Sequence, residues 1–90
     1  MPLYKIEWKK SAVKELKKLD KKIIPRIINA VELLSESPIP NKCKKLIGSE
    51  HIYRIRIGDY RIIYSIENNL LLIEIIRIGH RKDIYKKNKK

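Results

Sequence analysis

The chain has 90 residues and a formal net charge of +12, from 22 Lys and Arg against 10 Asp and Glu. A hydrophobic content of 43% excludes wholesale disorder, the lack of a long uncharged apolar run excludes a membrane span, and one cysteine excludes a disulfide framework or a cysteine-rich zinc site. We therefore expect one domain over residues 1–90, with no metal, no cofactor and no membrane contact, in the cytoplasm because the N-terminus has no secretory pattern.

The N-terminal third predicts a strand followed by two helices. Residues 3–8 alternate between two faces, as a half-buried strand does. Ser11 is a candidate N-cap for a short amphipathic helix. Asp20 is a candidate cap for a second helix, which carries Pro25 in its first turn and ends near residues 35–37. Together the two helices are expected to form a hairpin.

Residues 52–78 predict three antiparallel strands that follow a basic loop. The first turn is Gly58-Asp59, with glycine at the first central position that two-residue hairpins favour. This turn places Arg56 directly across from Arg61, with Arg54 on the same face because side chains alternate along a strand. Guanidinium groups that share a face repel one another, so the pattern predicts a phosphate-binding site. The alternative is a solvated outer face whose arginine stems cover apolar surface.

The second turn is predicted at Asn68-Asn69, because asparagine tolerates positive φ. The residues that it would pair all lie on the face that meets the helices. The pairs are Ile66 with Leu71, Tyr64 with Ile73 and Ile62 with Ile75. The predicted fold class is therefore α+β, with an N-terminal strand, a helical hairpin and a three-stranded antiparallel meander in a single domain.

A second basic segment near the C-terminus carries His80, Arg81 and Tyr85. The net charge favours polyanions such as nucleic acid, although an acidic protein or an anionic lipid would also satisfy it. Several lysines of the loop and the tail are predicted to contact RNA backbone, with ordinary solvation as the alternative. They are Lys42, Lys44, Lys45, Lys82, Lys86 and Lys87.

These segments resemble the RelE/ParE superfamily of toxins from toxin–antitoxin systems, most closely its RelE branch of ribosome-dependent messenger-RNA interferases. The resemblance covers nearly the whole chain. It rests on Tyr53-Arg54-Ile55-Arg56, Gly58-Asp59-Tyr60-Arg61-Ile62-Ile63-Tyr64, and Gly79-His80-Arg81 followed by Ile84-Tyr85. It implies a fold similar to small microbial ribonucleases. The implied partners are the ribosome, messenger RNA and an acidic, helical RelB-like antitoxin, and whether the complex is a heterotetramer stays open.

The resemblance also implies a metal-independent endoribonuclease of a type II system, in which a ribose 2′-hydroxyl attacks the adjacent phosphate. Arg61 and Arg81 match arginines that hold the scissile phosphate, and Tyr85 matches a tyrosine that orients a base. Arg54 and Arg56 stand where other members carry lysines. An arginine keeps its proton at ordinary pH, so these two side chains can clamp a phosphate but make poor general bases.

For proton transfer the sequence offers His80, because an imidazole titrates near neutral pH, with Tyr85 and Glu74 as alternatives. Two other functions stay open. The chain could be a ParE-like inhibitor of DNA gyrase, which shares the fold without cutting RNA. It could also be a non-catalytic member that only binds RNA or the ribosome, since Arg54 and Arg56 replace the usual lysines.

Overall fold

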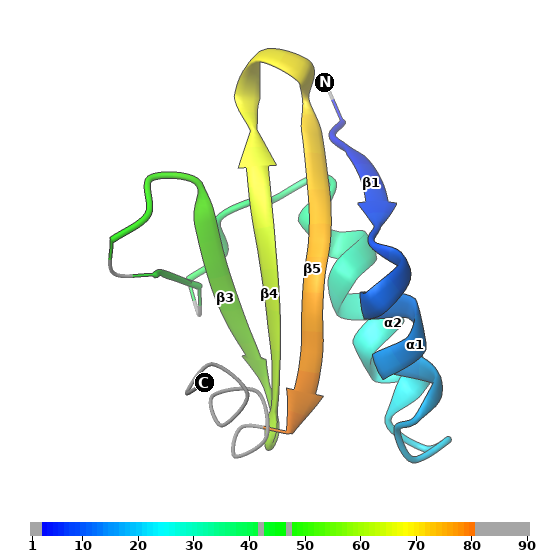
Figure 1. Cartoon of the computed structure of the whole chain (residues 1–90). Helices are drawn as coiled ribbons and strands as arrows, with labels where there is room; N and C mark the ends of the chain where they lie inside the picture. The colour runs from blue at the N-terminus through cyan, green and yellow to red at the C-terminus, as the bar shows by residue number, and fades with distance from the viewer. Residues whose placement is uncertain (1–2, 42, 47, 81–90) are drawn as a thin grey trace.

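A computed structural model describes residues 3–41, 43–46 and 48–80 of the chain. Two helices pack on one face of a five-stranded sheet in this part of the molecule (Figure 1). The elements are β1 (Lys5–Trp8), α1 (Lys10–Lys17), α2 (Ile24–Leu34), β2 (Lys44–Lys45), β3 (Ile52–Ile57), β4 (Tyr60–Glu67), a 3-10 helix (Asn68–Leu70) and β5 (Leu72–His80). The predicted α+β class is confirmed, including the strand, the helical hairpin and the antiparallel meander.

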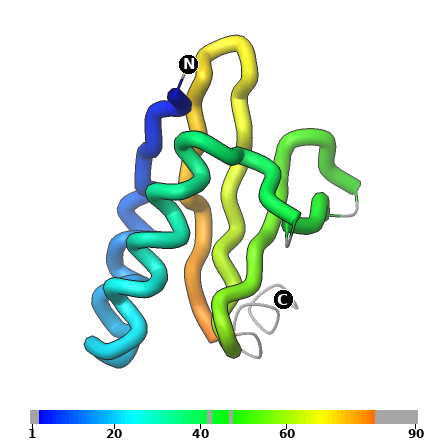
Figure 2. Tube along the Cα trace, turned by 180° about the vertical axis from the view of Figure 1, so that it is seen from behind, coloured from blue at the N-terminus to red at the C-terminus, as the bar shows by residue number. Residues whose placement is uncertain are grey.

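The strand order across the sheet is β1-β5-β4-β3-β2. β3, β4 and β5 are antiparallel neighbours, whereas β1 pairs with β5 in parallel. The first and last strands therefore lie side by side, as Figure 2 shows from behind. β2 adds two residues to the outer edge of β3, in a segment for which the sequence predicts only a loop.

The two helices begin differently from the prediction. α1 starts at Lys10 after an extended Lys9 that makes no side-chain cap, so Ser11 is not the N-cap. The Lys9 N–H donates to the Ile75 carbonyl oxygen of β5 (3.0 Å), which holds Lys9 extended. The Lys9 carbonyl oxygen accepts the first helical hydrogen bond, from the Val13 N–H (3.0 Å), so the helix starts directly after Lys9. Asp20 caps a turn before α2 rather than the helix, through Lys22 N–H to Oδ1 (3.1 Å). No helix in the described ranges is long and apolar enough to cross a membrane.

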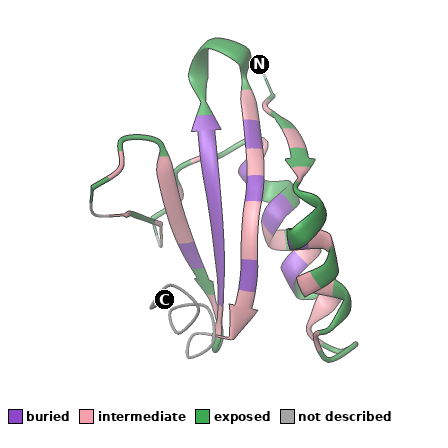
Figure 3. Cartoon of the chain, viewed as in Figure 1, coloured by how far each residue is buried: buried purple, intermediate pink, exposed green. Residues whose placement is uncertain are grey.

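The core lies between the helices and the sheet face that the alternation predicts. β4 is the middle strand, and every residue from Arg61 to Ile66 is buried (Figure 3). The buried apolar residues of this core cluster are Ala12, Ile27, Val31, Leu34, Ile55, Ile62, Tyr64, Ile66, Ile73, Ile75 and Ile78. The side chains of β4 that face away from the helices are thus nearly as enclosed as those in the core.

The predicted two-residue turn at Asn68-Asn69 is wrong. Residues 68–70 form a 3-10 helix that ends on Leu71 in the left-handed conformation, with φ at +50°. The longer turn pairs Ile66 with Ile73 instead of Leu71. Because the shift is an even number of residues, Ile73 stays on the core face. Leu71, expected in the core, is 39% exposed.

A β-bulge further along β5 adds a second change of register. Ile63 pairs with Arg77 and Tyr64 with Ile75, so Ile76 is an extra residue on β5. Strict alternation after Ile75 would point Arg77 into the core. With the extra residue, Ile78 takes that place instead and is 1% exposed.

Candidate anion-binding site

The site is built on the hairpin between β3 and β4. Gly58 has φ at +59°, the conformation that its place in the turn requires. The turn pairs Ile57 with Tyr60 and Arg56 with Arg61, which confirms the predicted register. Two arginines are thus held directly opposite each other on neighbouring strands, an arrangement that opposes folding unless an anion lies between them.

We expect Gly58→Ala to lower the free energy of unfolding by about 1–2 kcal/mol, because a left-handed backbone is strained for residues with a Cβ. An added Cβ would meet no atom within 4 Å, so the backbone conformation alone sets this cost. Urea denaturation of the two proteins measures the difference. An unchanged free energy of unfolding would show that the turn does not hold this conformation in solution.

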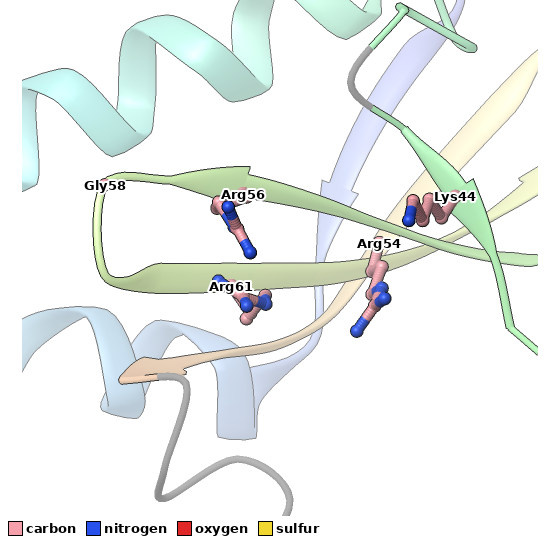
Figure 4. A pocket seen from close by; sticks show the side chains of 5 residues that line it. All are labelled: Lys44, Arg54, Arg56, Gly58 and Arg61. Atoms are coloured by element: carbon pink, nitrogen blue, oxygen red, sulfur yellow. The ribbon is translucent and has the colours of Figure 1, made fainter.

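A cavity of about 590 Å³ lies over this part of the sheet and is lined by Lys44, Arg54, Arg56, Gly58 and Arg61 (Figure 4). Lys44 on β2 pairs with Arg54 on β3, and Arg56 on β3 pairs with Arg61 on β4. Directly paired residues share a face of the sheet, so three strands supply the four cations. None of the described residues that line the cavity is acidic. Its volume falls within the range of small-ligand pockets.

Arg61 is the least solvated of these cations. It is 7% exposed, and its Nη1 atom is buried without a hydrogen bond to any described residue. An unpaired buried charge is strongly unfavourable, so native structures rarely keep one without a reason. Because Arg61 lines the cavity, a shift of its side chain toward the cavity would let this donor pair with an anion bound there. The buried donor and the cationic lining make the cavity a candidate site for a negatively charged ligand.

The structure does not bring His80 to this cavity. His80 pairs with Tyr60, whose side chain packs on the core, and the two rings meet edge to face with centroids 5.6 Å apart. Arg61 pairs instead with Gly79. His80 and Arg61 therefore lie on opposite faces of the sheet. Glu74 pairs with Ser65 and does not line the cavity either.

Comparison with known proteins identifies the family. Residues 6–85 match the model of the ParE toxin of type II toxin–antitoxin systems, parDE. The chain belongs to the RelE/ParE toxin superfamily. Toxin RelE3 of Methanocaldococcus jannaschii is 34% identical, and the match covers 90% of this chain and 94% of that toxin.

Solved structures of the superfamily share the fold. The archaeal RelE–RelB complex from Pyrococcus horikoshii OT3 is similar with a TM-score of 0.79 and 31% identity, over 90% of this chain and 98% of that one. The RelBE2 toxin–antitoxin complex from Mycobacterium tuberculosis has the same TM-score at 27% identity, over 92% and 97% of the two chains. The expected membership of this superfamily is confirmed.

Within this RelE/ParE chain, six predicted site residues lie outside the described ranges, and their roles stay predictions. They are Lys42, Arg81, Lys82, Tyr85, Lys86 and Lys87. Lys45 is exposed on β2 beside Lys44. The sequence placed Lys44 in an RNA-binding fringe, whereas the structure places it in the cavity wall. A two-residue strand leaves no alternation in the sequence from which this position could be predicted.

Proposed function

We propose that this protein is the toxin of a type II toxin–antitoxin system and that it cuts messenger RNA on the ribosome. Superfamily membership and the RelE toxins among its relatives support the toxin role. The observation that carries the finer proposal is the cationic cavity, which is lined by Arg61, whose buried Nη1 donor has no partner among the described residues. A phosphodiester of RNA is an anion that this donor can bind.

The proposed reaction is transesterification within the RNA. The ribose 2′-hydroxyl loses its proton and attacks the adjacent phosphorus, while the bond from phosphorus to the 5′-oxygen breaks and that oxygen gains a proton. The products are a 2′,3′-cyclic phosphate and a free 5′-hydroxyl. Such a step requires alignment, stabilisation of the extra negative charge on phosphorus and two proton transfers.

Arg56 and Arg61 are assigned to the developing charge, since they face each other across the hairpin and open onto the same cavity. Arg54 and Lys44 would hold the neighbouring RNA backbone. Because guanidinium groups keep their protons, proton transfer falls to other groups. The proposed catalytic residues also include His80, Arg81 and Tyr85. His80 lies on the opposite face of the sheet from Arg61, so it would contact the RNA only if the RNA extended past the end of β5.

The test is a purified translation system with a defined messenger RNA. We expect wild-type protein to cut within translated codons and to leave 5′-hydroxyl and cyclic phosphate ends, and to leave the same RNA intact when ribosomes are omitted. Equal cleavage of naked RNA would contradict the ribosome dependence. No cleavage under either condition would contradict the enzymatic proposal as a whole.

The proposed partner is an acidic RelB-like antitoxin. Two similar toxins, from Mycobacterium tuberculosis and Pyrococcus horikoshii, were solved in complexes with their antitoxins, and this chain carries a net charge of +12. An apolar groove of about 420 Å³ between α2 and β3 offers a contact surface, with Leu33 at its side 66% exposed. Arg56 lines both this groove and the cationic cavity. A partner bound in the groove would therefore lie next to the site that it must block.

A second candidate is inhibition of DNA gyrase, which the match to the ParE toxin model favours. Its test is a supercoiling assay with purified gyrase and a titration of this protein. Inhibition near one toxin per enzyme, together with no RNA cleavage, would replace the ribonuclease proposal. Full supercoiling activity at a large excess of toxin would remove this candidate.

A further inference from the structure

The end of β5 lacks a strand neighbour on one side within the described part of the chain. β1 pairs with β5 only from Leu72 to Ile75, because the chain then turns into α1, whereas β5 continues to His80. The backbone N–H groups beyond Ile75 on this side have no described strand to accept their hydrogen bonds. An unsatisfied backbone donor is unfavourable, so another acceptor is required here.

Glu15 of α1 supplies that acceptor. Its Oε1 atom accepts a hydrogen bond from the Ile78 N–H at 2.8 Å. Its Oε2 atom accepts from Arg77 Nη2 at 3.1 Å and from Arg77 Nε at 3.4 Å. Both side chains are only 20% exposed, so solvent screens this pair less than a surface ion pair. One carboxylate thus joins the helix to the backbone and to a side chain of β5.

Along β5, the residues that Glu15 contacts lie between the bulge and Gly79, the residue paired with Arg61. The bulge leaves Ile76 as an extra residue on β5. The register in which β5 pairs with β4 after the bulge determines which residue lies across from Arg61. In the observed register Gly79 is directly across from Arg61. Glycine adds no side chain next to Arg61, which lines the cavity.

A slip of one residue would change what lies beside Arg61. Either Ile78 or His80 would then be paired with it, and a bulky side chain would take the place of the glycine. We propose that Glu15 is a positioning residue for the anion site, because its hydrogen bonds to Arg77 and Ile78 hold β5 in the register that keeps Gly79 opposite Arg61. The link to catalysis rests on the proposed ribonuclease function.

Three variants test this role. Glu15→Ala removes all the acceptors, Glu15→Gln keeps the length of the side chain and one oxygen acceptor, and Glu32→Gln is the matched control. Glu32 is exposed on α2, and its replacement removes the same charge as Glu15→Gln. The readouts are amide hydrogen exchange at Ile78, the dissociation constant of inorganic phosphate, and kcat and KM for cleavage of ribosome-bound RNA.

We expect Glu15→Ala to speed exchange at Ile78 about ten- to a hundredfold, as loss of a hydrogen bond to a charged group implies. Phosphate binding should weaken about tenfold and kcat should fall about tenfold, with KM for ribosomes within about twofold, because the change acts on the position of the scissile phosphate. Glu15→Gln should lie between Glu15→Ala and wild type, and Glu32→Gln should match wild type.

If the Ile78 amide of a folded Glu15→Ala protein exchanged at the same rate as in the wild type, the proposal would be overturned. Faster exchange with unchanged phosphate affinity would overturn it as well, since the contact would then be structural only. If Glu15→Ala does not fold, Glu15→Gln decides by the same two readouts. A wild type that binds phosphate but cuts no RNA would contradict the proposed function alone, because exchange and phosphate affinity still measure the effect of Glu15.

Discussion

Replacing Arg61 by methionine is expected to slow RNA cleavage by about a hundred- to a thousandfold, the usual loss when one preorganised donor to a developing charge is removed. The same change should stabilise the protein, because it removes a buried guanidinium whose Nη1 has no partner among the described residues. We expect the free energy of unfolding to rise by about 1–3 kcal/mol. Cleavage rates and urea denaturation give the two values.

Arg26→Met is the matched control. Arg26 is exposed on α2 and does not line the cavity, so its replacement removes one positive charge from the surface alone. We expect wild-type cleavage and a change of less than about 0.5 kcal/mol in the free energy of unfolding. A loss of more than about 1 kcal/mol in Arg61→Met would show that the guanidinium is well paired in the folded protein, and would contradict a donor kept for a ligand.

Above about pH 10, the free energy of unfolding is expected to fall by about 1.4 kcal/mol per pH unit through Tyr64 alone. Its ring is fully buried, and its hydroxyl donates to the Pro38 carbonyl oxygen at 2.7 Å and lies 3.1 Å from Cys43 Sγ. Burial raises the pKa of Tyr64 far above its ordinary value of 10.0, and the Cys43 contact raises it further. The unfolded chain then loses this proton at high pH while the folded protein keeps it, so stability falls as pH rises.

Tyr64→Phe removes this titration. The variant should lose about 1–2 kcal/mol at pH 7, because the Pro38 carbonyl oxygen loses its donor, but it should have a shallower decline between about pH 10 and 11. Tyr4→Phe controls for loss of a hydroxyl at the surface, where Tyr4 donates to Asn68 Oδ1 at 2.7 Å, and should cost less than about 0.5 kcal/mol at pH 7. Equal slopes in wild type and Tyr64→Phe would contradict this account of Tyr64.

The parts of the fold that depend on local rules could be predicted from the sequence. Glycine at the first turn position sets the register of the β3–β4 hairpin, and that register alone brings Arg56 and Arg61 together. Alternation then places Arg54 on the same face. Between the turn and the bulge the core face is equally predictable, because an error of two residues in register leaves Ile73 and Ile75 on their predicted face.

The residues around Arg61 depend on the length of the β4–β5 turn and on the bulge in β5, which neither alternation nor turn composition predicts. The predicted register pairs Ile62 with Ile75, whereas Ile62 pairs with Ile78 in the structure. The register is thus shifted by three residues. The longer turn, with Leu71 in an unfavourable left-handed conformation, shifts it by two residues, and the bulge shifts it by one more. Neither has a sequence signal in this chain, and together they place Gly79 opposite Arg61.

The most direct measurement is a structure of this protein bound to an RNA dinucleotide whose 2′-hydroxyl is replaced by hydrogen, so that it cannot be cut. We predict a phosphate oxygen within about 3 Å of Arg61 Nη1, with Arg56 on the other side of the same phosphate. A dinucleotide bound elsewhere, with Arg61 Nη1 still lacking an anionic partner, would contradict the proposed anion site.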